Sequence, residues 1–242
     1  MSVLFTAASS MALLVPSAAR PVATIYPLTV GGWYRWATAS GVVENGVAVG
    51  DTSGGALQTR KDAADAITIS DEFSVNEATL TSLFSANIWT HLICRFITST
   101  NRRYSGLRSD GTFATATAAG SKTFTGSVIS LGCWVDGTSD GMSGSVAEFW
   151  WCESDIAVAT ENLTAAQHRQ IAFGGPFSWP TIAANLKVYD SFYNNYGNRS
   201  PPNAIFARGK APFLYTKSAT VPNMGAHCPY VLPPEQPLQW RI

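Results

Sequence analysis

Three histidines, His91, His168 and His227, are the side chains best suited to move protons at neutral pH. They are isolated from one another along the chain, and their spacing assigns no nucleophile and base pair to any of them. The sequence also has no glycine-rich phosphate-binding loop before a predicted helix. We therefore expect structural roles for all three histidines.

Aromatic and acidic residues in the middle of the chain are better candidates for binding. Trp134 leads into a polar, glycine-rich loop that contains Asp136 and Asp140. Trp150 and Trp151 are adjacent in a strand-like run, so they should face opposite sides of it, and one should leave the core. An exposed indole on a sheet face indicates contact with a glycan or with another protein, and we favour a protein. The predicted ligand-binding residues are Trp134, Asp136, Asp140 and Trp150.

Aspartates in two loops also raise the question of calcium, which takes about six to eight oxygen ligands. Asp136 and Asp140 lie in one predicted loop, and Asp51 lies in another. Asp-Gly pairs form turns in their own right, which is the simpler explanation of these residues. No metal or other cofactor is therefore predicted, and calcium is kept as the alternative.

Alternation of apolar residues predicts β-strands up to residue 152. In the strongest of them, Thr90, Leu92, Cys94 and Phe96 share one face, and Trp89, His91, Ile93 and Arg95 share the other. Further strands are expected at 3–6, 12–15, 29–36, 65–69, 78–83, 129–135 and 146–152. Asn45-Gly46 predicts a hairpin turn, because this pair readily takes positive φ angles.

One short helix is expected after these strands. Thr164 and Gln167 have the spacing of a capping box, in which each side chain accepts from the other's backbone amide. Gly174 stands where a left-handed residue often ends a helix. The helix should have about two turns, with Ile171 as its buried anchor.

The composition changes after residue 174. Ten of the 13 prolines lie from Pro176 onward, and proline cannot donate to the interior of a sheet. Residues 1–174 hold 10 Lys/Arg and 14 Asp/Glu, whereas residues 175–242 hold 6 and 2. We interpret 175–242 as an extended arm that packs on the sandwich or crosses to a neighbour. Its predicted assembly residues are Phe213, Tyr215, Tyr230 and Trp240.

The overall composition excludes some classes of protein. Charged residues are 13% of the 242 residues, about half of the usual share, so much of the surface should be neutral. This is typical of a subunit covered by neighbours, or of an all-β protein with small polar residues outside. The absence of a basic stripe argues against nucleic acid, and no apolar run is long enough for membrane insertion. Four widely spaced cysteines, Cys94, Cys133, Cys152 and Cys228, are expected to be free thiols.

Four motifs in order resemble the concanavalin A-like lectin/glucanase superfamily, which includes laminin-G-like domains. They are the strand Trp89-Thr90-His91-Leu92, the turn Ser109-Asp110-Gly111, the strand Gly144-Ser145-Val146-Ala147-Glu148 and the helix start Leu163-Thr164-Ala165-Ala166-Gln167. The resemblance implies an all-β fold, an antiparallel jelly-roll β-sandwich over 1–174, followed by the Pro-rich arm of 175–242.

The related glucanases carry their acids in one strand, in the pattern E-x-D-x-x-E. Retaining hydrolysis of glycosides needs two carboxyl groups about 5 Å apart. The comparable strand here has Glu148, and the next acid is Glu153, beyond Trp151 and Cys152. We therefore expect Glu148 to make a structural hydrogen bond near a sheet edge, and the protein is predicted not to be an enzyme.

Within the superfamily, the resemblance is greatest to members encoded by bacteriophages and prophages, including the stretch Pro229-Tyr230-Val231-Leu232-Pro233-Pro234. It implies a non-enzymatic virion structural protein, namely a head decoration, head-fibre or tail adhesin protein, made in the host cytoplasm. The implied partners are other virion proteins and copies of itself in a homo-oligomer, with a glycan on a host surface as a further partner. The alternatives are a cellular or secreted carbohydrate-binding module and, more distantly, a glucanase-like hydrolase.

Overall fold

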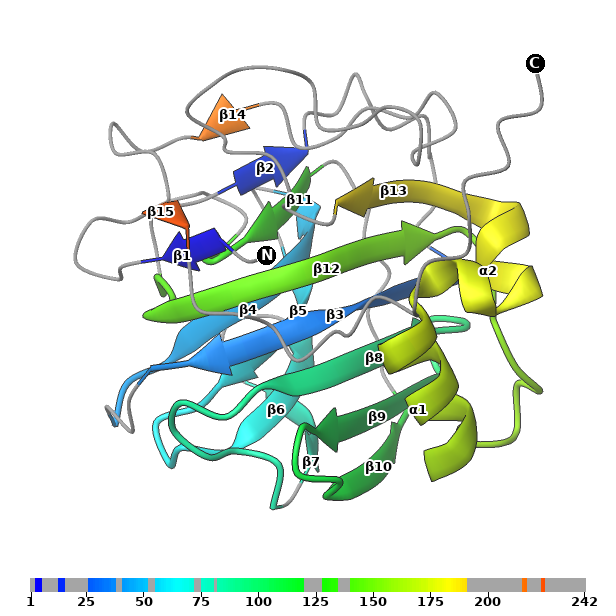
Figure 1. Ribbon diagram of the computed structural model, residues 1–242, viewed down its shortest axis with the longest axis horizontal. Helices are drawn as coiled ribbons and strands as arrows, with labels where there is room; N and C mark the ends of the chain where they lie inside the picture. Colours follow the sequence, from blue (N-terminus) through cyan, green and yellow to red (C-terminus); the bar gives the residue numbers. More distant parts are fainter. Residues whose placement is uncertain are drawn as a thin grey trace.

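The computed structural model describes residues 3–5, 13–15, 26–37, 41–51, 55–71, 75–80, 82–119, 128–134, 140–190, 215–216 and 223–224. Two antiparallel sheets face each other across a hydrophobic core, and helices cover the outer face of one sheet (Figure 1). The predicted fold class, an all-β jelly-roll sandwich, is confirmed.

Sheet A contains eight strands among the described residues: β10 (Phe113–Ala118), β9 (Arg102–Arg108), β8 (Thr90–Phe96), β3 (Leu28–Trp36), β12 (Gly144–Cys152), β1 (Val3–Phe5) and β15 (Asn223–Met224) in this order, with β13 (Leu186–Asp190) paired to β12. Sheet B contains seven: β14 (Tyr215–Thr216), β2 (Leu13–Val15), β11 (Val128–Leu131), β4 (Glu44–Asp51), β5 (Gly55–Lys61), β6 (Ile67–Asp71) and β7 (Val75–Leu80). The edge strands β7 and β10 lie side by side and close one end of the sandwich.

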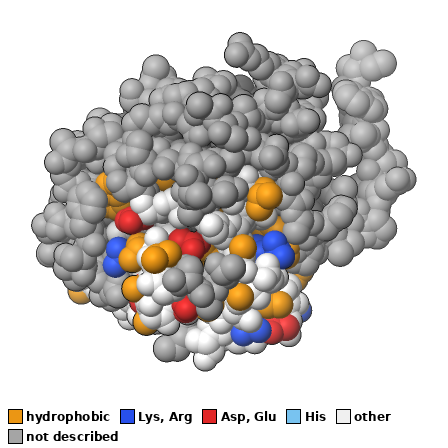
Figure 2. Space-filling view, turned by 90° about the vertical axis from the view of Figure 1, so that its left-hand side faces the viewer, with side chains coloured by type: hydrophobic (Ala, Val, Ile, Leu, Met, Phe, Trp, Pro, Cys, Tyr) orange, Lys and Arg blue, Asp and Glu red, His pale blue; other side chains and the backbone are white. Residues whose placement is uncertain are grey.

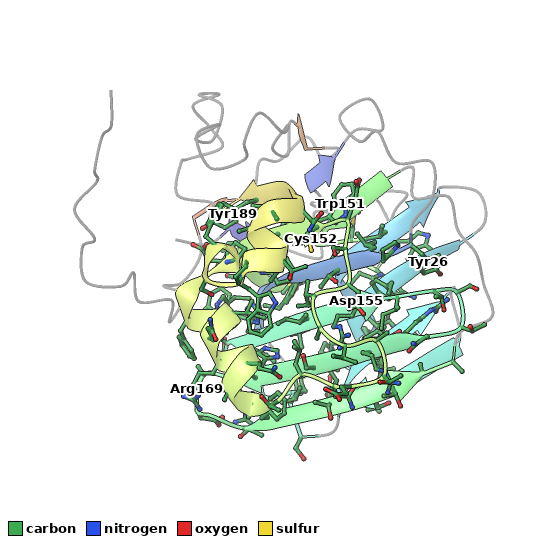
Figure 3. All side chains as sticks on the ribbon, turned by 90° about the vertical axis from the view of Figure 1, so that its right-hand side faces the viewer. Tyr26, Trp151, Cys152, Asp155, Arg169 and Tyr189 are labelled. Atoms are coloured by element: carbon green, nitrogen blue, oxygen red, sulfur yellow. The ribbon has the colours of Figure 1, made fainter. Side chains whose placement is uncertain are left out.

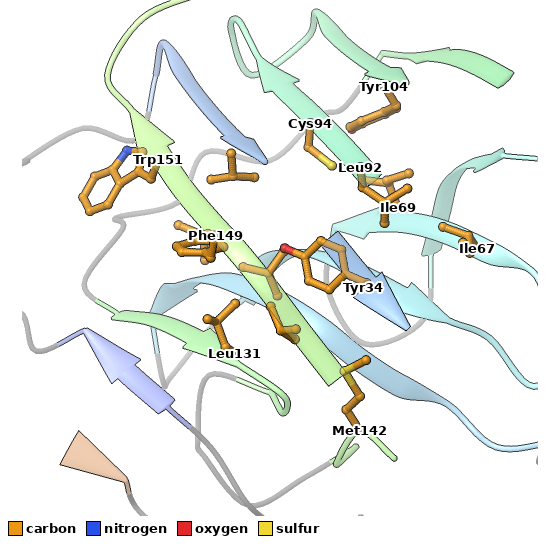
Figure 4. Packing of buried hydrophobic residues seen from close by; sticks show 14 of the residues in the cluster. Tyr34, Ile67, Ile69, Leu92, Cys94, Tyr104, Leu131, Met142, Phe149 and Trp151 are labelled. Carbon is orange, nitrogen blue, oxygen red and sulfur yellow. The ribbon is translucent and has the colours of Figure 1, made fainter. Parts of the chain in front are cut away.

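The main core lies between the two sheets. In β8, Leu92, Cys94 and Phe96 face this core, as the alternation predicts. Figure 4 shows Leu92 of sheet A packed against Ile69 of sheet B. Each apolar side chain that is fully buried in this way contributes about 1.5 to 3 kcal/mol to folding.

The outer face of sheet A is buried as well, although antiparallel sheets commonly leave one face to water. It is covered by α1 (Ala165–Gly174), the 3₁₀-helix η3 (Pro176–Ser178), α2 (Pro180–Asn185) and the loop 153–164 (Figure 3). Two apolar clusters form there, one around Trp150 and Ile171 and the other around Trp33 and Ala172. Sheet A is therefore the middle layer of a three-layered structure.

Helix α1 begins as predicted. The backbone amide of Gln167 donates to Oγ1 of Thr164 at 3.3 Å, and the amide of Thr164 donates to Oε1 of Gln167 at 2.8 Å. Ile171 is fully buried, which confirms it as an anchor. The helix has 10 residues, however, and the residue with positive φ (72°) is Gly175 and not Gly174. Helix α2 was not predicted.

The predicted Asn45-Gly46 turn is wrong. Both residues lie inside β4, where the register with β5 shifts. Gly46 lies close to the ring of Tyr34, since a Cβ at this position would be 2.9 Å from Tyr34 Cδ1. The glycine thus permits a close approach to a ring. The strand predicted over 129–135 also ends early, at Leu131, because Gly132 has a φ of 79°.

The predicted arm begins inside the folded body. Strand β13 pairs with β12 in sheet A, and further along the chain β14 pairs with β2 and β15 with β1. Residues 176–190 therefore belong to the same packed layers as the sandwich. Of the predicted assembly residues, Tyr215 lies in β14, while Phe213, Tyr230 and Trp240 lie outside the described residues. Their assembly role stays a prediction.

The described surface carries charges of both signs. On the face shown in Figure 2, Lys and Arg side chains lie among Asp and Glu side chains and small apolar groups. In the part of the chain that the structure describes, no helix is both long and apolar enough to cross a membrane.

Candidate functional site

The two tryptophans predicted to bind a ligand are buried. Trp134 is 2% exposed and Trp150 is 1% exposed, and Trp151 lies in the core between the sheets. The expectation that one of Trp150 and Trp151 is exposed on the sheet face is therefore wrong. Trp150 does leave the central core, but the helical layer on the outer face of sheet A covers it.

The predicted loop aspartates are described only in part. Asp136 lies outside the described residues. The carbonyl oxygen of Asp140 accepts the backbone amide of Asn45 at 2.9 Å, which ties this loop to β4. In the described ranges, no three His, Cys, Asp or Glu residues come together as metal ligands. Binding by these residues stays a prediction.

Strand β12 changes its partners around Glu148. On one side, β1 pairs with residues 144–146 and β13 with residues 149–152. On the other side, the register with β3 shifts between Ala147 and Trp150. Glu148 has a left-handed backbone with a φ of 51°, which costs a non-glycine residue about 1 to 3 kcal/mol. This bulge interrupts the alternation of side chains along β12.

The Glu148 carboxylate is bonded to the neighbouring strand. Tyr189 of β13 donates its phenolic O–H to Oε2 of Glu148, and Glu148 is only 7% exposed. The predicted structural hydrogen bond of Glu148 is thus confirmed. Figure 3 shows Tyr189 beside α2, on the outer side of sheet A.

An exposed aromatic ring lies beside the bonded pair of Glu148 and Tyr189. Phe177 of η3 meets Tyr189 edge to face, with ring centroids 5.3 Å apart and planes at 89°. Phe177 is 40% exposed and is the aromatic residue among the exposed large apolar residues of the described ranges. We call Glu148, Tyr189 and Phe177 the Glu148 edge. Sequence spacing could not find it, because only the pairing of β13 with β12 brings these residues together.

The histidines are not isolated in space. His91 Nδ1 and His168 Nε2 are 2.9 Å apart, although the residues are 77 positions apart in the sequence. His168 Nδ1 also lies 2.8 Å from the hydroxyl of Ser105. All three residues are at most 2% exposed, so a substrate cannot reach them in this structure. His91 and His168 are thus buried structural residues whose pairing was missed, and His227 lies outside the described residues.

Arg95 fastens the loop that precedes α1. Its Nε and Nη2 donate to the two carboxylate oxygens of Asp155 at 2.6 and 3.0 Å. Nη1 donates to the carbonyl of Glu161 at 2.6 Å, and Nη2 also donates to the carbonyl of Val158 at 3.0 Å. The guanidinium is 1% exposed, so its charge is matched by Asp155 inside the protein. This group positions the outer layer and is not free for a ligand.

The three described cysteines, Cys94, Cys133 and Cys152, are buried free thiols, as predicted, and Cys228 lies outside the described residues. Burial raises the pKa of the Cys94 thiol to about 12, and it raises the pKa of the Cys152 thiol to about 12. Both sulfurs are therefore protonated at neutral pH and have no nucleophilic role.

No protein-family model matches the sequence, and no curated protein was found to match it. Among solved structures, a candidate carbohydrate-binding protein from Bacteroides ovatus aligns with 78% of this chain and 50% of its own, at 13% identity and a TM-score of 0.52. Tailspike protein 2 of an Escherichia coli O157:H7 bacteriophage aligns with 62% of this chain and 22% of its own, at 15% identity and a TM-score of 0.49.

Domains LG4-5 of the mouse laminin α1 chain align with 62% of this chain and 41% of their own, at 12% identity and a TM-score of 0.45. This chain thus spans half or less of each of these three proteins. The likeness to the Bacteroides ovatus protein, at 13% identity, indicates a shared fold and nothing finer. The chain is a jelly-roll β-sandwich with a helical layer over the outer face of sheet A.

Proposed function

We propose that this chain is a non-catalytic attachment and assembly protein of a virus particle, and that it holds a glycan at the Glu148 edge. The observation that carries the proposal is the exposed ring of Phe177, packed on a tyrosine whose phenol is bonded to a buried carboxylate. The lectin-like fold and the phage-type motifs of the sequence support this setting.

The chemistry of the Glu148 edge suits a sugar. A sugar ring presents C–H groups on its faces and hydroxyl groups at its rim, so it needs an apolar surface and hydrogen-bond acceptors side by side. Phe177 supplies the apolar surface, and the carboxylate of Glu148 and the phenol of Tyr189 supply oxygen atoms beside it. The strained backbone of Glu148 supports a functional role, because such strain tends to gather at binding sites.

Two features favour binding over catalysis. Asp155, an acid of the loop that follows β12, is bonded through both carboxylate oxygens to Arg95. The outer face of sheet A, over which a cleft along β12 would run, is filled by the clusters under α1 and α2. A second catalytic carboxyl group opposite Glu148 is therefore not part of our proposal.

The glycan-binding part is tested on a glycan array with four proteins: the original chain, F177A, E148Q and V158A. Val158 is 60% exposed on the loop 153–164 and serves as the matched surface control. We expect binding to a subset of glycans, at least about tenfold weaker in F177A and E148Q, which equals about 1.4 kcal/mol, and unchanged in V158A. Unchanged binding in F177A and E148Q, or no glycan binding at all, would overturn this site. Release of reducing sugar that E148Q abolishes would show an enzyme instead.

The particle part needs its own measurement. Quantitative mass spectrometry of purified particles of the virus or prophage that encodes the chain should find it in many copies per particle. Its absence from such particles, together with intact glycan binding, would replace the virion role by that of a carbohydrate-binding module.

A further inference from the structure

The buried pair of histidines joins the helical layer to sheet A. His91 comes from β8, His168 from α1 and Ser105 from β9, so the chain of contacts from Ser105 through His168 to His91 crosses from the sheet into the helix. His168 is 0% exposed and His91 is 1% exposed. Both contacts are polar links between α1 and the strands of sheet A.

We propose that the His91–His168 pair is an acid-sensitive latch, which holds α1 on sheet A at neutral pH and releases it when the solution becomes acidic. This inference does not depend on the proposed glycan site. It concerns a change of structure and not a second binding site.

The two facing ring nitrogens of His91 and His168 can share only one proton. The facing nitrogens are 2.9 Å apart, so one of them donates and the other accepts. If both rings become imidazolium ions, two N–H groups point at each other across this distance and the hydrogen bond is lost. If only one ring is protonated, a positive charge is left in a site that is closed to water.

The surroundings of the pair offer no anion to hold that charge. Trp33 meets the His91 ring at 5.2 Å and Phe113 meets the His168 ring at 5.7 Å between centroids. Among the described residues, no carboxylate is bonded to either imidazole. The charged side chains on the surrounding elements are Arg35 of β3, Arg95 of β8, Arg102, Arg103 and Arg108 of β9, Glu148 of β12 and Arg169 of α1.

Most of these charges have partners of their own, and most are positive. Arg35 is bonded to Asn87, Arg95 to Asp155, and Glu148 to the phenol of Tyr189. Arg103 donates to the carbonyl of Ala159. The guanidinium groups repel a further positive charge on the pair. Moving α1 away from the sheet exposes the protonated histidines to water and so removes most of this electrostatic cost.

The direction of the pH effect follows from the closed state. Burial lowers the pKa of His168 to about 3, and burial together with the neighbouring His168 holds the pKa of His91 well below its usual value. The pKa of a histidine is about 6.5 when α1 is open and is lowered when α1 is closed. The pair therefore stabilises the closed state fully above about pH 6.5, and this stabilisation is lost as the pH falls from there toward about 3.

The other attachments of helix α1 to sheet A are mainly apolar, and they include the edge-to-face contact of Trp33 with Phe173. The helix buries three residues, His168, Ile171 and Ala172, of which two are apolar. The indole N–H of Trp33 also donates to the carbonyl of Ala172 at 3.2 Å. Gly175, with a φ of 72°, follows the helix directly. Release of α1 would uncover an apolar surface formed by Trp33, Trp89, Leu107 and Ala147.

Hydrogen exchange of α1, measured by mass spectrometry at about pH 7.5 and about pH 5 and corrected for intrinsic rates, tests the latch. At pH 5, the opening equilibrium of residues 165–174 should rise by about thirtyfold for each histidine, and so by up to about a thousandfold in all. Amides of β3 and β8 should stay protected. In H91N/H168Q, which keeps amide groups near the bonded nitrogens but cannot titrate, the rise should vanish.

The third histidine of the chain provides the matched control, because H227Q removes a titrating group without touching the pair. H227Q should show the full rise. The latch is overturned if α1 stays protected at pH 5, if all of sheet A loses protection together with α1, or if H91N/H168Q shows the same rise as the original chain. Should the double variant fail to fold, H168Q alone decides, with a rise of about thirtyfold expected and the full rise contradicting the inference.

Discussion

Glu148 shows how one residue can depart from the pattern of its strand for a reason. The alternation along β12 breaks at this position, and the carboxylate is bonded to Tyr189 of the next strand. Glycine takes the left-handed backbone conformation of Glu148 at little cost, so the bulge alone does not require a glutamate. The carboxylate therefore has a role that the backbone shape does not explain.

Urea unfolding of Glu148 variants measures that role. Glu148→Ala removes an acceptor of the Tyr189 phenol and should lower the free energy of unfolding by about 1 to 3 kcal/mol. Glu148→Gln keeps an oxygen acceptor and should cost about 1 kcal/mol. In a double-mutant cycle with Tyr189→Phe, the two losses should not add, because both remove the same bond. Strict additivity would show that the bond contributes nothing to stability.

The buried thiols make a second prediction at this scale. A thiol with a pKa of about 12, as for Cys94 and Cys152, is almost entirely protonated at pH 8 and cannot attack a disulfide reagent. In the native protein, Ellman's reagent should therefore leave Cys94 and Cys152 unmodified, and it should not reach Cys133, because that residue is fully buried. In denaturant without reductant, all four cysteines of the chain should react. A smaller count in denaturant that rises after reduction would reveal a disulfide and contradict the prediction.

At the scale of elements, the loop 153–164 shows how an irregular segment is fixed on a sheet. Its backbone carbonyls at Val158 and Glu161 and the carboxylate of Asp155 all turn to one guanidinium, that of Arg95. Ala159 accepts in the same way from Asn101 and Arg103. Arg95 and Arg103 of sheet A, together with Asn101 just before β9, thus replace the hydrogen bonds that regular secondary structure would supply.

Arg95→Met tests this arrangement. Removal of one partner leaves Asp155 and two carbonyls without their buried donor, so the free energy of unfolding should fall by about 3 to 5 kcal/mol. Hydrogen exchange should quicken over residues 153–164 before the strands of sheet A open. Arg169, which is exposed on α1, is the control, and Arg169→Met should change stability by less than about 0.5 kcal/mol. Equal effects of the two substitutions would contradict the special position of Arg95.

Patterns within a few neighbouring residues correctly predicted those helices and strands whose residues suit only one kind of structure. The faces of β8 and the start of α1 follow from alternation and capping, which act within a few residues. Asn45-Gly46 failed because the same glycine that suits a turn also suits a strand pressed against an aromatic ring. Local sequence does not distinguish these two uses of glycine.

The layers on sheet A could not be predicted from the sequence, for a different reason. Trp150 and Trp151 face opposite sides of β12, as alternation requires, but a second layer buries the outer side. Gly31 is part of that fit, since a Cβ there would lie 2.2 Å from Cζ2 of Trp150. Contacts of this kind join residues more than a hundred positions apart. The Glu148 edge and the histidine pair were missed for a similar reason, because their bonded residues are 41 and 77 positions apart in the sequence.

At the scale of the whole molecule, the position of residues 175–242 decides where the chain can be truncated without loss of its fold. Residues 176–190 include η3, α2 and β13, and they cover the cluster around Trp150, Cys152 and Ile93. Beyond them, β14 and β15 pair with β2 and β1, the short strands at the other end of the chain. A truncation that keeps this cover must therefore end at Asp190 or later, and not at Gly174.

Two truncations separate these parts of the chain. A chain that ends at Gly175 loses the cover of Trp150 and Cys152, so it should aggregate or unfold. A chain that ends at Asp190 keeps this cover and both helices, and it should remain folded with β-type circular dichroism, although β1 and β2 lose a partner strand each. If residues after 190 serve in assembly, as we propose, light scattering should show oligomers for the full chain and monomers for the chain that ends at Asp190. Oligomers in both would place the assembly surface on the sandwich.

An unfolded chain ending at Asp190 would mean that the later residues complete the core, and the assembly role assigned to them would be wrong.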